Sequence, residues 1–120
     1  MGVTRVTVVL TVLRTTDSAY EADFLVDTGA TDCLAPAAKL KEIGVEPVGK
    51  SAYEWADGTL HEYAYGPVQI KVMGEVTAGR VIFGPDNAEP LLGVTALESV
   101  GLTVDAANQT LRRLPAIPLK

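Results

Sequence analysis

The feature that most constrains the fold is a succession of short alternating segments separated by frequent turn signals. Every second residue from Val6 to Val12 is apolar, and a period of two is typical of a β-strand. Residues 20–26 alternate in the same way and run directly into Asp27. Further strands are predicted at 51–56, 59–65, 67–73, 75–83, 102–105 and 109–114. Many short strands with frequent turns favour a small barrel or sandwich.

Glycine and its neighbours mark the predicted connections between these strands. Asp57-Gly58 is a strong signal for a two-residue hairpin turn between the strands at 51–56 and 59–65. Gly74 is expected to join the next strand pair, and Pro85 to Pro90 to form a loop. The last two strands are expected to close the sheet around a turn at Asn108.

Two short helices are predicted between the strands. Residues 36–43 place Pro36 in a first helical turn and Gly44 just past the helix end, the positions that these residues favour. Residues 95–100 are expected to form a second helix that ends at Gly101.

Length and composition set limits on the class of protein. The chain has 120 residues, which suits a single domain spanning 1–120. Its net charge of −5 argues against a broad nucleic-acid-binding surface. The single cysteine, Cys33, excludes a disulfide within the chain, and we expect a cytoplasmic location. Residues 1–13 are too short to span a bilayer and are interrupted by Arg5, so no membrane association is expected.

The motif that carries the chemistry is Phe24-Leu25-Val26-Asp27-Thr28-Gly29-Ala30. An apolar strand delivers one carboxylate to a turn of small residues. The Thr28 hydroxyl can fix that turn by hydrogen bonding, and Gly29 permits close backbone approach. This construction is expected to hold Asp27 rigidly at the end of a strand.

The sequence resembles the retropepsin-like aspartic proteases. Besides the Asp-Thr-Gly-Ala motif, the likeness rests on Leu91-Leu92-Gly93, which precedes a short apolar helix, and on the expected hairpin 53–65, which stands where that family carries its flap. The resemblance spans nearly the whole chain. It implies an all-β fold, a small closed β-barrel of the acid-protease type with one or two short helices, and aspartic endopeptidase activity without a cofactor or metal ion.

The resemblance also implies a role for each motif residue. Asp27 would be the catalytic carboxylate, Thr28 would brace two active-site loops against each other, and Gly29 and Ala30 would complete the loop. Leu92 and Gly93 would pack behind it. The predicted flap tip, which would lie over an extended peptide substrate, consists of Ala56, Asp57, Gly58 and Thr59.

A single Asp-Thr-Gly motif implies a homodimer. Aspartic-protease chemistry needs two carboxylates around one water: one accepts a proton as the water attacks, and the other donates a hydrogen bond to the carbonyl oxygen of the scissile bond. This chain carries one such motif, so a twofold axis would have to supply the second carboxylate.

Other interpretations of the same residues remain. The fold could serve as a dimerisation or peptide-binding module with little or no cleavage. Asp27 to Thr31 also fits the phosphate loop of sugar kinases, but those enzymes need two large α/β lobes, which 120 residues cannot build. Trp55 is expected either in the core or against substrate, and Asp32 at the substrate, at a helix cap or in solvent. His61 is expected at the surface, and Cys33 in the interior.

Overall fold

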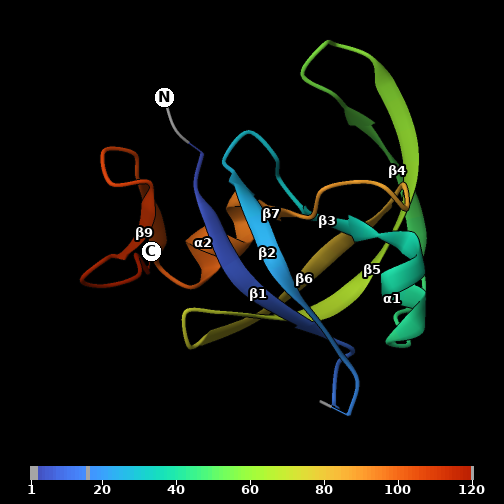
Figure 1. Ribbon diagram of the computed structural model, residues 1–120, viewed down its shortest axis with the longest axis horizontal. Coiled ribbons are helices and arrows are strands. Elements are labelled where there is room, and N and C mark those ends of the chain that lie inside the picture. Colours follow the sequence, from blue (N-terminus) through green and yellow to red (C-terminus); the bar gives the residue numbers. More distant parts are fainter. Residues whose placement is uncertain (1–2, 16, 120) are drawn as a thin grey trace.

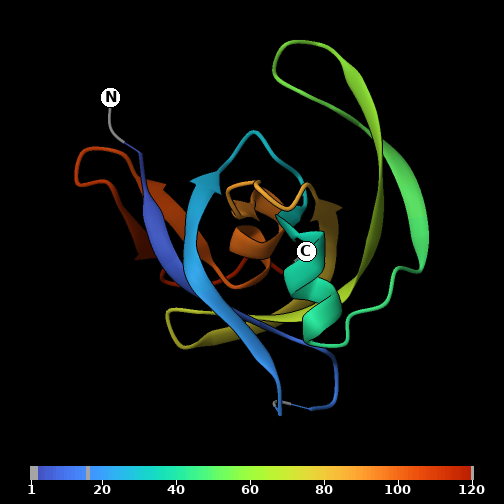
Figure 2. The ribbon, with the colours of Figure 1, turned by 45° about the vertical axis from the view of Figure 1, so that its right-hand side comes forward.

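The main element of the fold is a closed ring of six strands. The computed structural model describes residues 3–15 and 17–119. In the seven-stranded sheet, β5 pairs back to β1 and so closes the ring (Figures 1 and 2). The predicted small closed β-barrel is therefore confirmed. In ring order the strands are β1 (Arg5–Thr11), β2 (Ala19–Asp27), β7 (Leu91–Gly93), β3 (Cys33–Pro36), β6 (Glu75–Gly84) and β5 (Leu60–Val72).

The barrel interior is filled by the apolar residues of the alternating strands. Val8 and Leu10 on β1 and Phe24 on β2 are completely buried, as are Val68 on β5 and Leu92 on β7. Successive side chains of a strand point to opposite faces, so a closed sheet buries every second residue and leaves no exposed edge within the ring. The period of two in the sequence is the signature of this burial.

Two short helices connect the barrel strands. Helix α1 (Ala37–Glu42) begins after Pro36 and is followed by Gly44 with φ of 91°, and α2 (Val94–Ser99) is followed by Gly101 with φ of 73°. Both glycines adopt the left-handed conformation that commonly ends a helix, so both predicted helices are confirmed to within one residue at each end. Within the described part of the chain, no helix has the length and apolar character to cross a membrane.

The seventh strand of the sheet lies outside the ring. Strand β4 (Gly49–Glu54) pairs only with the first half of β5 and forms a hairpin that extends beyond the barrel (Figure 1). The expected two-residue turn at Asp57-Gly58 is wrong. The Gly58 N–H donates to the Trp55 carbonyl at 2.9 Å, and of Ala56, Asp57 and Gly58 only Gly58 has a positive φ. This is a three-residue loop, because a two-residue type I′ turn would need positive φ at both central positions.

Strand β5 is longer than the sequence suggested. The strands expected at 59–65 and 67–73 are one continuous strand through Gly66 and Pro67. Pro67 is tolerated because the β4 pairing of β5 ends at Tyr65 and the β1 pairing begins at Gln69, so no strand on that side requires its missing N–H. A Cβ on Gly66 would lie 2.5 Å from the Glu46 carbonyl oxygen, so this position requires glycine for close approach.

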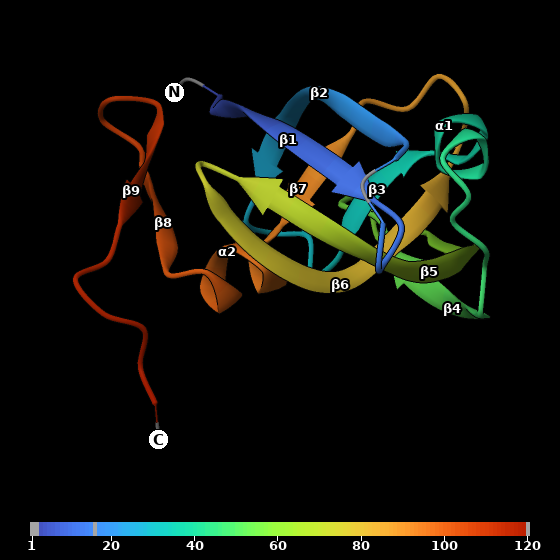
Figure 3. The same cartoon turned by 90° about the horizontal axis from the view of Figure 1, so that it is seen from below.

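The C-terminal strands do not close the barrel sheet, contrary to expectation. Strands β8 (Leu102–Asp105) and β9 (Thr110–Arg113) pair only with each other in a second, two-stranded sheet. This hairpin stands to one side of the barrel (Figure 3). Its turn includes Gln109, with φ of 54°, next to the predicted Asn108.

Candidate active site

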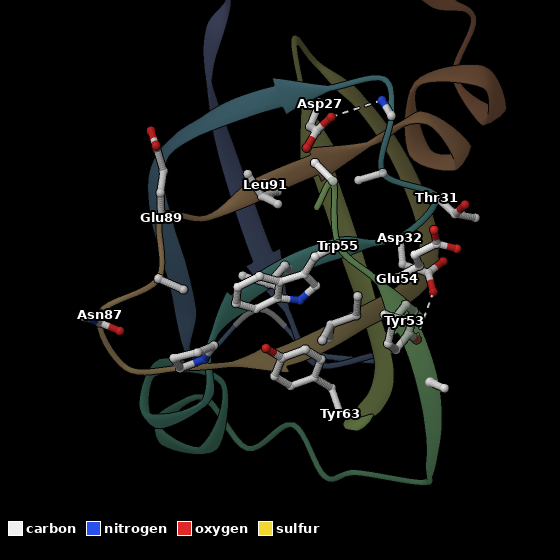
Figure 4. Close-up of a pocket in the computed structure, with 18 residues that line it drawn as sticks. Asp27, Thr31, Asp32, Tyr53, Glu54, Trp55, Tyr63, Asn87, Glu89 and Leu91 are labelled. Carbon is white, nitrogen blue, oxygen red and sulfur yellow. Dashed lines mark hydrogen bonds between the residues drawn. The ribbon is translucent and has the colours of Figure 1, made fainter. Parts of the chain in front are cut away.

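Asp27 occupies the last position of β2, where the chain leaves the barrel. Its backbone is in register with Gly93 of the parallel strand β7. The Gly29 N–H donates a hydrogen bond of 3.0 Å to Asp27 Oδ1 (Figure 4), and the Ala30 N–H donates one of 3.1 Å to the Asp27 carbonyl. The carboxylate is thus oriented by its own loop, and Asp27 remains partly exposed to the cleft described below.

The loop that follows Asp27 is attached to the segment that begins α2. The Val94 N–H donates to the Ala30 carbonyl at 2.8 Å, and the Thr95 N–H donates to the Thr31 carbonyl at 3.2 Å. Leu92 is completely buried beneath this contact. The structure therefore brings together the Asp-Thr-Gly-Ala and Leu-Leu-Gly motifs, which are about 60 residues apart in the sequence.

Thr28, unlike Asp27, Gly29 and Ala30, does not belong to the lining of the cleft described below. It is exposed, and among the described residues it has no hydrogen-bond partner. Its expected function as a brace between two loops concerns a second subunit and stays a prediction.

A cleft of about 1060 Å³ separates the Asp27 loop from the β4–β5 hairpin. Its floor includes Asp27, Gly29 and Ala30, and its apolar wall includes Leu34, Ile82 and Leu91. From the hairpin come Tyr53, Trp55 and Ala56. Of the predicted tip residues, Ala56 lines the cleft, whereas Asp57, Gly58 and Thr59 lie in the turn beyond its lining. Trp55 belongs to the cleft and is 47% exposed, which excludes the core position considered from the sequence.

A hydrogen bond connects the hairpin to the Asp27 loop. The Tyr53 hydroxyl donates to Asp32 Oδ2 at 3.2 Å. Burial raises the pKa of the Tyr53 phenol above 10.0, and the neighbouring Asp32 carboxylate raises it further. The sequence analysis placed Asp32 at the substrate, at a helix cap or in solvent, and did not anticipate this contact with the hairpin; Asp32 also lines the cleft. Sequence reasoning missed Tyr53, although aromatic residues at alternate hairpin positions were a signal of its orientation.

Glu89, which lines the cleft, forms an ion pair with Arg5. Arg5 Nη2 lies 2.8 Å from Glu89 Oε2, and both side chains are about half exposed. In residues 3–15 and 17–119, no group of three or more His, Cys, Asp or Glu side chains is arranged to hold a metal ion.

Cys33 lies behind the Asp27 loop and is 1% exposed, as expected from the sequence. Burial raises the pKa of its thiol to about 11. At pH 8 we expect alkylation by iodoacetamide to be at least about tenfold slower in the folded than in the urea-unfolded chain, because fewer thiolates form, and burial slows it further. Quenched time points analysed by mass spectrometry measure both rates. Equal rates would contradict the burial of Cys33.

Comparison with known proteins supports the fold. No protein-family model and no curated protein matches the sequence. The structure is similar to the EIAV protease, solved with the inhibitor HBY-793, with 22% identity and a TM-score of 0.59 over 83% of this chain and 89% of that chain. It is similar to a retropepsin-like aspartic protease from Rickettsia conorii, with 19% identity and a TM-score of 0.53 over 85% and 77% of the two chains.

A third similar structure is the retroviral protease-like domain of Ddi1 from Leishmania major. The identity is 17% and the TM-score 0.56, over 96% of this chain and 92% of that chain. At these identities the likeness concerns the arrangement of the backbone. Together with the closed barrel and the two short helices, it shows that the chain has a retropepsin-like fold.

Proposed function

We propose that the chain is an aspartic endopeptidase in which two Asp27 carboxylates of a homodimer activate one water molecule. The observation that carries this proposal is the position of Asp27, oriented by the Gly29 N–H on the floor of a large cleft beneath a hairpin. The retropepsin-like fold supports the same assignment, since solved structures with this fold include proteases.

The chemistry requires the two carboxylates to act differently. One accepts a proton as the water attacks the peptide carbonyl, while the protonated partner donates a hydrogen bond to the carbonyl oxygen and stabilises the developing charge. In this proposal Thr28, Gly29 and Ala30 support the loop, and Leu92 and Gly93 fix it from behind. The residues of this chain supply all of the groups that the reaction needs, and no cofactor is involved.

A second copy of the chain is the proposed partner. Apolar side chains are exposed near the two chain ends, namely Val3, Leu114, Ile117 and Leu119. The N-terminal segment and the β8–β9 hairpin lie on the side of the molecule away from the β4–β5 hairpin in both views (Figures 1 and 2). Covering these side chains would contribute to the stability of a dimer, and the twofold axis of that dimer would also have to pass beside Asp27 to bring the second carboxylate to the same water.

The substrate would bind as an extended peptide. Backbone groups of a hairpin can pair with such a peptide as a strand does. Closure of the β4–β5 hairpin over the peptide would then exclude water and fix the scissile bond.

Incubation of the purified chain with a varied peptide library tests the proposal, with products identified by mass spectrometry. We expect internal peptide bonds to be cleaved, and the rate per chain to rise with protein concentration until the dimer is saturated. Sedimentation equilibrium at the same concentrations measures the dimer. Peptide binding without cleavage at any pH would instead indicate a peptide-binding module. Cleavage by a strictly monomeric chain would contradict the shared site.

A further inference from the structure

The β4–β5 hairpin concentrates the aromatic residues of the chain. The segment 53–65 contains the single tryptophan and three of the four tyrosines of the sequence. Tyr53 is paired across the hairpin with His61, and Tyr53, Trp55 and Tyr63 all line the cleft. The hairpin extends beyond the barrel and has no core of its own to fill, yet it carries one exposed ring, Trp55, and three partly buried tyrosine rings, which requires another explanation.

Three of the rings form a continuous stack. The Trp55 and His61 ring centroids are 4.2 Å apart with an interplanar angle of 27°, and those of His61 and Tyr63 are 6.2 Å apart at 21°. His61 covers one side of the indole, and Trp55, which is 47% exposed, lines the cleft. Figure 4 shows the indole extending across the cleft between Leu91 and Tyr63.

A chain of hydrogen bonds holds His61 in this stack. The Thr59 hydroxyl donates to Asp57 Oδ1 at 2.6 Å, and the Thr59 N–H donates to the same atom at 2.9 Å. Both bonds lower the pKa of the Asp57 carboxyl, the side-chain bond more strongly. A hydroxyl has one proton to donate, so Thr59 Oγ1 accepts its 2.9 Å hydrogen bond from His61 Nε2. Asp57 and Thr59 thereby fix the tautomer and orientation of His61.

We infer that Trp55 determines the specificity of the cleft and selects peptides that place an aromatic side chain against the hairpin. The inference rests on the proposed function and adds a substrate class to it. Aromatic rings in offset or edge-to-face contact are held more strongly than their buried area explains.

Paired peptides test this selection. Each position of a cleaved peptide is replaced in turn by phenylalanine and by cyclohexylalanine, which has similar size but no π-system. We expect phenylalanine to raise kcat/KM about three- to tenfold over cyclohexylalanine at one position. In Trp55→Leu the ratio should fall to about one while cleavage continues. Leu60→Ala, at an exposed hairpin position outside the cleft lining, is the matched control and should keep the ratio. A ratio of one at every position, or a stronger preference for arginine, would overturn the inference.

His61 is a positioning residue that acts through Trp55. Variants of His61 distinguish loss of the Trp55 orientation from a general loss of folding. His61→Ala should lower the phenylalanine ratio toward one, whereas His61→Phe, which keeps a flat ring beneath the indole, should restore most of it. If the two variants fold equally well but give the same ratio, the stack does not position Trp55.

A binding measurement distinguishes failure of this inference from failure of the proposed function. Trp55 is the only tryptophan of the chain, so its fluorescence reports this site whether or not a peptide is cleaved. Acetyl-Ala-Phe-Ala-amide should bind more tightly than its cyclohexylalanine counterpart and shift the emission. If the two peptides bind with this difference but neither is cleaved, the proposed endopeptidase activity is refuted and the role of Trp55 is retained. If both peptides bind equally, the role of Trp55 in selecting aromatic side chains is refuted.

Discussion

Replacing Asp27 with asparagine is expected to lower kcat for peptide hydrolysis by about 10³-fold or more. The amide cannot accept a proton from the attacking water, and no shared proton remains to stabilise the carbonyl oxygen. The amide oxygen of the new side chain can still accept the Gly29 hydrogen bond that Asp27 Oδ1 accepts at 3.0 Å, so the loop should keep its shape. Initial rates on a cleaved peptide measure the loss, and thermal unfolding by circular dichroism checks the fold.

The control is Asp23→Asn, which removes the same charge from the same strand. The Asp23 carboxylate accepts a 3.0 Å hydrogen bond from Thr7 and does not belong to the cleft lining, so its loss should leave the rate nearly unchanged. Mixing wild-type and Asp27→Asn chains tests the shared site directly. If subunits exchange, the rate should fall as the square of the wild-type fraction, because only a dimer with two aspartates is active. A linear fall would show that each chain works alone.

The barrel was predictable because the burial of one face of each strand imposes an alternating pattern on neighbouring residues of the sequence. A strand that buries one face against a closed interior must alternate, and Val8, Leu10 and Phe24 show this both in the sequence and in their complete burial. The helix ends were also predictable from neighbouring residues, since Gly44 and Gly101 adopt the positive φ that glycine favours. In these segments the preference of a few neighbouring residues agrees with the whole fold.

The remaining features depend on contacts between distant segments. Gly66-Pro67 is a local signal for a break, but the strand continues because its neighbours change there from β4 to β1. Strands β8 and β9 were expected from their patterns, yet nothing in those patterns states which sheet they join. The bond between Tyr53 and Asp32 depends on how the hairpin lies over the loop, and the sequence alone does not determine that orientation.

Replacing Gly93 with alanine is expected to destabilise the fold by about 2–3 kcal/mol and to lower kcat/KM more than about 100-fold. A Cβ at this position would lie 2.5 Å from the Asp32 carbonyl oxygen and 2.8 Å from that of Thr31. Both atoms belong to the backbone of the Asp27 loop and cannot rotate away. Because Gly93 is also in register with Asp27, relief of the overlap would displace the carboxylate.

Gly79→Ala is the matched control, since Gly79 is also a strand glycine without positive φ. Its added Cβ would meet only Ile70 Cδ1, at an ordinary contact distance of 3.7 Å. Urea unfolding midpoints and initial rates of both variants separate a general cost of alanine from displacement of the loop. If Gly93→Ala matched Gly79→Ala in stability and rate, the loop could move aside freely. The fixed position of Asp27 would then not be the property that makes this cleft an active site.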